Sequence, residues 1–175
     1  MEKLVSKLMM EKAFAALDRR LPKDLTLILG GGGCMILAHG YPLATIDVDA
    51  LPLQASFEEI DPFVKEVAVE LGLSADWLNP YFSSFTYVLP HDYQARLVEV
   101  FSGRRLTVRG LGKVEMLIMK CFAHRPKDLG HARALMKGGV DVKLVEDVIG
   151  RHLDKALPGA QDALDFLDQL KEEFE

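Results

Sequence analysis

Residues 25–51 read LTLILGGGGCMILAHGYPLATIDVDAL, and this stretch decides the expected fold. The apolar run Leu25–Leu29 opens directly into the glycines at 30–33, which predicts a buried strand that ends in a tight turn. Residues 34–39 then predict a short helix, because a glycine follows them at the position where helices often end.

A second strand is expected over residues 45–51, where polar and apolar side chains alternate. The alternation puts Asp47 and Asp49 on the same face. The apolar residues of the opposite face are Ile46, Val48 and Ala50. Two ionised carboxylates are costly to bury without partners, so the pair either faces water or binds a divalent cation. Mg²⁺ usually takes one or two carboxylates together with phosphate oxygens of the substrate.

The glycine run at 30–33 allows two interpretations. Glycines let backbone N–H groups approach a phosphate closely at a helix N-terminus, which would put a phosphate site beside the metal pair. Alternatively, the run is a tight turn that needs small residues for packing. It is neither a P-loop, because no Gly-Lys-Ser/Thr follows, nor a good dinucleotide fingerprint, because Ile36 stands where the last glycine should be.

Outside this stretch the sequence predicts mostly helices. Residues 2–21 predict an amphipathic helix that Pro22 stops. A helix ending at Gly72 begins either at Asp61-Pro62 or earlier, after Ser56. The other expected elements are a strand pair over 94–101 and 105–109 and helices over 115–124, 127–137, 141–153 and 160–174.

These elements predict an α/β (α+β) fold with a small mixed sheet, flanking helices and a helical C-terminal half. We expect a single domain over residues 1–175, with the sheet in about 22–112 and the helical part in about 113–175. A net charge of -5 argues against an all-over basic nucleic-acid surface. The two cysteines have no ligand spacing, and no apolar run approaches the ~20 residues needed to cross a bilayer. A cytoplasmic protein without a membrane anchor is therefore expected.

Three short motifs, in this order, carry a family resemblance. Gly32-Gly33, His39-Gly40 and Thr45-Ile46-Asp47-Val48-Asp49 resemble the GG…hG…T-x-D-h-D signature of the polymerase-β-like nucleotidyltransferases. The nearest branches are bacterial proteins akin to the AbiEii abortive-infection and toxin–antitoxin proteins. The resemblance covers residues 25–137 through further segments at Trp77-Leu-Asn79, Leu117-Ile-Met-Lys120, 123–128 and Leu135.

The resemblance implies a magnesium-dependent transfer of a nucleoside monophosphate. Asp47 and Asp49 would bind Mg²⁺ or Mn²⁺. The residues expected to contact the nucleoside triphosphate are Gly32, Gly33, Thr45 and Lys120. An acceptor would attack the α-phosphate in line, and pyrophosphate would leave. The acceptor, whether protein, RNA or small molecule, is not specified by these motifs, and a partner protein or a homodimer is compatible with them.

The resemblance also implies a third catalytic and metal-binding carboxylate from an adjacent strand, and Glu99 is the candidate. Its alternation with Leu97 and Phe101 also fits a structural ion pair, with Arg96 or Arg104. Lys120 likewise has two interpretations, because a lysine among apolar helix residues either reaches a cleft or snorkels to water.

Two positions depart from the family pattern. Leu43 stands where many relatives carry arginine, and His131 where they often carry a second aspartate. Three hypotheses follow: an active nucleotidyltransferase, a catalytically silent relative that binds a nucleotide or a partner in a toxin–antitoxin or phage-defence system, and an unrelated α/β domain.

Overall fold

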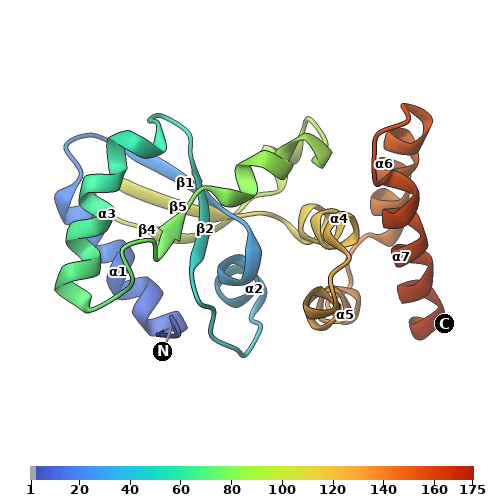
Figure 1. Ribbon diagram of the computed structural model, residues 1–175, viewed down its shortest axis with the longest axis horizontal. Helices are drawn as coiled ribbons and strands as arrows, with labels where there is room; N and C mark the ends of the chain where they lie inside the picture. The colour runs from blue at the N-terminus through green and yellow to red at the C-terminus, as the bar shows by residue number, and fades with distance from the viewer. Residues whose placement is uncertain (1–2) are drawn as a thin grey trace. The chain divides into compact units, whose positions relative to one another are not determined.

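The computed structural model of this protein describes residues 3–175. These residues form a five-stranded mixed sheet and seven α-helices, joined by loops and 3-10 segments (Figure 1). This architecture confirms the predicted mixed α/β fold with a helical C-terminal part. The chain forms two compact units. The first takes the residues up to Ser84 together with Leu97–Leu111, and the second takes Phe85–Arg96 and Gly112–Glu175.

The sheet lies in the first unit. Its strands are β1 (Leu25–Leu29), β2 (Val48–Pro52), β3 (Leu78–Asn79), β4 (Val98–Ser102) and β5 (Leu106–Gly110). The spatial order is β3-β2-β1-β5-β4. β1 is parallel to β5 and antiparallel to β2, while β3 is parallel to β2. β4 and β5 form an antiparallel hairpin.

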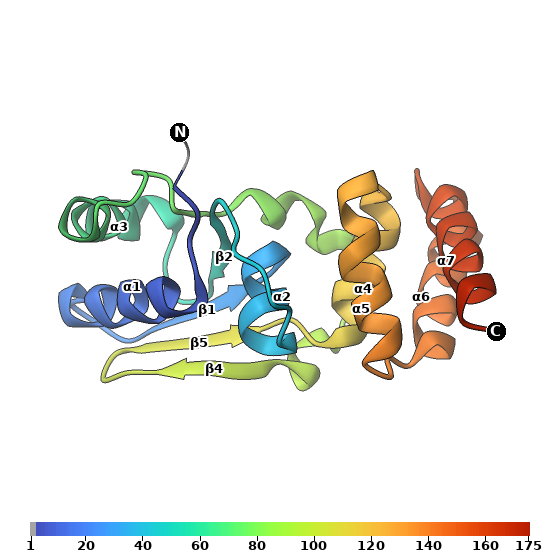
Figure 2. The same cartoon turned by 90° about the horizontal axis from the view of Figure 1, so that it is seen from below.

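Three helices complete the first unit, α1 (Lys7–Arg20), α2 (Gly31–His39) and α3 (Phe57–Leu71). α1 and α3 run side by side next to the sheet, and α2 leaves the end of β1 (Figures 1 and 2). The Ser56 hydroxyl accepts from the Glu59 N–H at 3.3 Å and completes a capping box, so α3 starts at the earlier of the two expected positions. The first expected residue of the α1 helix, Glu2, lies outside the described residues.

The core of this unit lies between the helices and one face of the sheet. Phe14 of α1 is fully buried, and its ring centroid lies 6.2 Å from that of Trp77. The Trp77 Nε1–H donates to the Val64 carbonyl at 3.0 Å, so its one polar group is satisfied. The sheet contributes buried residues of alternating positions, among them Leu25, Leu27, Leu29, Leu106 and Val108.

Two expected strands begin later than predicted. β2 starts at Val48, because Thr45 leaves the sheet to form an isolated bridge with Val5, and Ile46 is 51% exposed. Residues 93–96 form a 3-10 turn before β4. Conversely, α2 starts earlier than predicted, at Gly31.

The second unit is helical. It contains the 3-10 segment η2 (Tyr93–Arg96), α4 (Lys113–Ala123), η3 (Pro126–Asp128), α5 (Leu129–Lys137), α6 (Val142–Asp154) and α7 (Ala160–Phe174), and η1 (Tyr81–Val88) leads into it.

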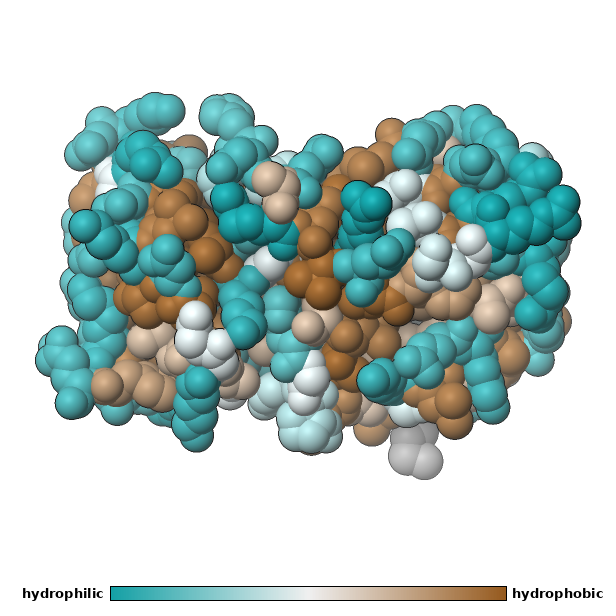
Figure 3. Space-filling model, turned by 180° about the vertical axis from the view of Figure 1, so that it is seen from behind, coloured by the Kyte–Doolittle hydropathy of each residue, from teal (hydrophilic) through white to brown (hydrophobic). Residues whose placement is uncertain are grey.

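Across residues 3–175, no helix combines the length and apolar character needed to span a membrane. Figure 3 shows apolar side chains at the surface among hydrophilic ones, as is usual for folded domains.

Candidate functional site

The glycine run forms the N-terminus of α2. β1 ends at Leu29, Gly30 is the N-cap, and the helix starts at Gly31 without an intervening loop. The first N–H groups of a helix have no partner within it and carry its positive end, and such groups can bind an anion. Gly31 and Gly32 are half-buried there, whereas Gly33 is buried.

Gly31 is the point where this helix meets the aspartate pair. Its φ is +59°, and Oδ2 of Asp49 occupies the space that a Cβ at this position would fill. The Gly30 N–H also donates to the Asp49 backbone carbonyl at 3.0 Å. A side chain at Gly31 would therefore be strained and would displace the carboxylate, which explains the need for glycine.

Gly30 is small for a different reason than Gly31. A Cβ at Gly30 would lie 3.1 Å from the Phe82 ring, and one at Gly33 would lie 3.4 Å from the Val48 side chain. Packing against Phe82 accounts for glycine at position 30, as the tight-turn interpretation expects, whereas a Cβ at Gly33 would make ordinary van der Waals contact. The phosphate site at the other glycines stays a prediction.

Asp47 is held by a residue of the neighbouring strand. Asn79 Nδ2 donates to Asp47 Oδ2 at 2.8 Å, and the Tyr81 N–H donates to Asn79 Oδ1 at 3.1 Å. Asn79 is only 2% exposed, so its amide is satisfied at both ends away from bulk water. The Thr45 hydroxyl, expected at a nucleotide, donates to the Asp47 backbone carbonyl at 2.9 Å.

Asp47 and Asp49 are the candidate ligands for a divalent cation. Both carboxylates are half-buried at the start of β2, one beside the helix N-terminus and one beside Asn79. Within residues 3–175, no group of three or more His, Cys, Asp and Glu side chains is placed to hold a metal ion. Two carboxylates suffice for Mg²⁺ when phosphate oxygens and water complete its shell, so the donor set suits metal bound together with a nucleotide.

The structure does not bring Glu99 to this pair. Glu99 is exposed on β4, opposite Arg109 of β5. Both β5 and β1 separate β4 from β2. The distance from β4 to β2 is three inter-strand spacings of about 4.8 Å each, or roughly 14 Å. Mg²⁺ holds its ligand atoms at about 2.1 Å, so one ion does not reach both strands. The strands that adjoin β2 are β1 and β3, and β3 supplies the neutral Asn79 instead.

Lys120 belongs to the second unit, where it forms a buried ion pair. Its Nζ lies 2.9 Å from Asp128 Oδ1, and the two side chains are 7% and 2% exposed. Arg125 Nε donates to the other oxygen of Asp128 at 2.7 Å. Burial acts to raise the pKa of Asp128, but the hydrogen bonds from Arg125 and Lys120 outweigh it and lower that pKa.

His131 lies near this cluster. Burial, with the positive charge of Lys120, lowers the pKa of His131 to about 4. The imidazole is therefore neutral at pH 7, where the expected aspartate of relatives would be charged.

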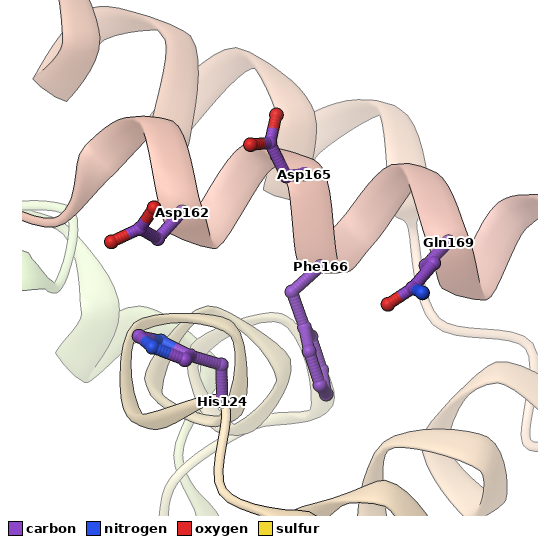
Figure 4. A pocket seen from close by; sticks show the side chains of 5 residues that line it. All are labelled: His124, Asp162, Asp165, Phe166 and Gln169. Atoms are coloured by element: carbon purple, nitrogen blue, oxygen red, sulfur yellow. The ribbon is translucent and has the colours of Figure 1, made fainter.

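A surface hollow of about 620 Å³ opens elsewhere in the second unit (Figure 4). Asp162, Asp165, Phe166 and Gln169 line it from α7, and His124 lines it from the end of α4. The His124 Nδ1 is 3.0 Å from the Phe122 carbonyl. The two aspartates here lack the glycine-rich helix N-terminus that adjoins Asp49. This hollow is therefore not our candidate site.

Comparison with known families finds one matching family model. A family model described as a nucleotidyltransferase of unknown function (DUF6036) matches residues 6–163. The chain belongs to this family. No curated protein and no solved structure matches it. Membership in this nucleotidyltransferase family excludes the hypothesis of an unrelated α/β domain.

Asn79 is the site residue that the sequence did not single out as functional. It was noted only as part of the segment Trp77-Leu-Asn79. Its signal would have been a polar residue directly after two large apolar ones, which suits a short buried strand, but a two-residue strand leaves no periodic pattern to detect.

Proposed function

We propose that this member of the nucleotidyltransferase family moves a nucleoside monophosphate from a nucleoside triphosphate to an acceptor in an Mg²⁺- or Mn²⁺-dependent reaction. The observation that carries the proposal is the contact between Asp49 and Gly31, which puts a carboxylate at the N-terminus of α2. A bound triphosphate is stabilised by the N–H groups of a helix N-terminus and by a divalent cation. In this arrangement the N-terminus of α2 would supply the first, and Asp49 would help to hold the second.

Each part of the site has a distinct task in this reaction. The N–H groups at Gly31 and Gly32 would bind phosphate oxygens of the triphosphate and hold the α-phosphate in position. Asp47 and Asp49 would hold the divalent ion, and the ion would neutralise the charge that develops as pyrophosphate leaves. Positioning and charge neutralisation account for most of the catalysis of phosphoryl and nucleotidyl transfer.

The acceptor is proposed to be a hydroxyl group of a protein, an RNA or a small molecule. Leu43, in the loop before Asp47, is 61% exposed and cannot bind an anion. The side of the site next to this loop therefore offers no cationic side chain at the position where relatives carry arginine.

The experiment is a transfer assay with two differently labelled substrates. The purified protein is incubated with α-³²P- or γ-³²P-labelled nucleoside triphosphates, Mg²⁺ and candidate acceptors that include the protein itself, RNA and cell extract. Covalent label from the α-position, with none from the γ-position and none in Asp47→Asn, supports the proposal. Label from the γ-position would show a kinase-type reaction instead.

A second function is favoured by the composition of the site. A neutral amide adjoins the aspartates where the resemblance leads us to expect a third carboxylate, and Glu99 lies on the far edge of the sheet. A relative of this kind would bind a nucleotide or a partner with little turnover, for example in a toxin–antitoxin or phage-defence pair of the AbiEii type. Nucleotide binding without transfer of the α-label would support this function.

A further inference from the structure

Asn79 reaches Asp47 from the strand next to it. β3 pairs with β2 in parallel, and the register sets Asn79 opposite Asp49. From there its side chain meets Asp47, with Nδ2 2.8 Å from Oδ2. Asn79 therefore adjoins both aspartates. Its backbone lies opposite Asp49 in the register, and its side-chain amide donates to Asp47.

The orientation of this amide follows from the chemistry of its partners. The Tyr81 N–H can only donate a hydrogen bond, so the atom that faces it at 3.1 Å must be Oδ1 of Asn79. The Nδ2 group then points to Asp47, whose carboxylate oxygen accepts its hydrogen bond. Because Asn79 is almost fully buried, no exchange with water competes with either bond.

We propose that Asn79 is a positioning residue that sets the metal-binding geometry and affinity of the aspartate pair; this inference rests on the proposed function. By holding Oδ2 of Asp47, Asn79 leaves Oδ1 as the oxygen that would be available to a divalent cation. Because the Asn79 amide is neutral, Asp47 and Asp49 would supply the only two carboxylates among the described site residues, and they would hold a divalent cation weakly without the added charge of nucleotide phosphates.

The test uses Mn²⁺ as the probe, because the EPR signal of the free hydrated ion disappears when the ion binds. Mn²⁺ affinity is measured on the full chain, first alone and then with the nucleoside triphosphate that wild type binds best. A protein-free titration corrects for the Mn²⁺ that the free nucleotide itself binds. Asn79→Leu keeps a side chain of similar size but removes both hydrogen bonds. Asn79→Asp supplies a third carboxylate at the same place.

Mutation of a residue that hydrogen-bonds to a metal ligand typically lowers metal affinity by about 10- to 100-fold. Asn79→Leu should therefore weaken Mn²⁺ binding in the presence of nucleotide by at least about tenfold. Asn79→Asp should strengthen the binding of Mn²⁺ alone by a similar factor, because the added charge replaces what the nucleotide supplies. The matched control is Gln54→Leu. Gln54 lies in the bend after β2, and its amide bonds to Thr26 of β1, away from the aspartates, so its loss should leave Mn²⁺ affinity within about twofold.

The outcomes separate this inference from the proposed function. If wild type binds Mn²⁺ with nucleotide but Asn79→Leu, shown to be folded by circular dichroism, binds equally well, Asn79 has only a structural role and the inference is wrong. If Asn79→Leu does not fold, Asn79→Asp decides: unchanged affinity for Mn²⁺ alone overturns the inference, and tighter binding supports it. If wild type binds no Mn²⁺ with or without nucleotide, the proposed function fails and this inference with it.

Discussion

The Asp49 carboxylate packs directly against Gly31, and its Oδ2 occupies the position that a Cβ of residue 31 would take. The backbone of Gly31 has the left-handed conformation that glycine adopts without strain, with a φ of +59°. This contact joins the end of the first strand, the start of α2 and the aspartate pair, so the properties of the site depend on it.

Gly31→Ala should therefore lose function as well as stability. The left-handed backbone makes alanine cost roughly 1 to 2 kcal/mol, and the new methyl group displaces the Asp49 carboxylate. Gly72→Ala is the matched control, because Gly72 has a φ of +62° but only the Lys3 ammonium nearby, at 3.5 Å. Urea denaturation should show similar losses for both variants, while Mg²⁺-dependent nucleotide binding should be lost only in Gly31→Ala. Equal nucleotide affinity in the two variants would contradict the assigned role of Asp49.

Asp18 should stabilise the β4–β5 hairpin in a pH-dependent way. Its carboxylate accepts the N–H groups of Arg104, Arg105 and Leu106 at 3.0, 2.7 and 2.7 Å. Burial acts to raise the pKa of Asp18, but these N–H groups outweigh it and lower that pKa below 3.8. Since the folded pKa is depressed, the stabilisation is present above pH 3.8 and is lost as the pH falls through the folded value.

Asp18→Asn should accordingly lower the free energy of unfolding by about 1 to 3 kcal/mol at pH 7. The difference from wild type should shrink when urea denaturation is repeated at progressively lower pH below 4. A difference that stays constant into strong acid would show that the charge of Asp18 does not matter.

The pair of Lys120 and Asp128 should act chiefly on stability. Asp128→Leu leaves the Lys120 ammonium buried without its partner, and breaking a buried pair in this way costs about 3 to 5 kcal/mol. Lys120→Met should cost less, because Arg125 still pairs with Asp128. Chemical denaturation measures both changes. Because Asp128 already engages its ammonium, folded Lys120→Met should bind nucleotide as wild type does, and a large loss of affinity would instead assign Lys120 to the nucleotide.

His131 should make the protein sensitive to mild acid. Its pKa is about 4 in the folded state against 6.5 for an ordinary histidine, so the unfolded chain takes up a proton first as the pH falls. The free energy of unfolding should decrease between pH 6.5 and 4 for this reason. His131→Leu should flatten this part of the stability profile measured by urea denaturation. An unchanged profile would mean that His131 is not the group responsible.

The glycine–aspartate region was predictable because its signals are local. A five-residue apolar run, a glycine turn and an alternating Asp-x-Asp segment each indicate a backbone state without knowledge of the rest of the chain. The capping box at Ser56 and Glu59 was likewise readable, although the sequence could not decide between it and Asp61-Pro62. The structure shows that both hydrogen bonds of the box form.

The third position of the site was not predictable because it depends on sheet topology. Glu99 lies on a real strand, but the order of the strands puts that strand at the edge opposite β3. Asn79 lies on a strand of two residues that exists only because it pairs with β2. Strand order and short pairings are tertiary features. The periodicity near Glu99 and Asn79 therefore could not predict which of the two lies on the strand next to the aspartates.

The most direct measurement is calorimetric titration of the purified protein with each of the four ribonucleoside triphosphates, with and without Mg²⁺, for wild type and for the double variant Asp47→Asn with Asp49→Asn. We predict saturable binding of at least one nucleotide that requires Mg²⁺ and is absent in the folded double variant. Binding that is equally tight without Mg²⁺ or in the double variant, or no binding of any nucleotide to wild type, would contradict a nucleotide and metal site at Gly31, Asp47 and Asp49.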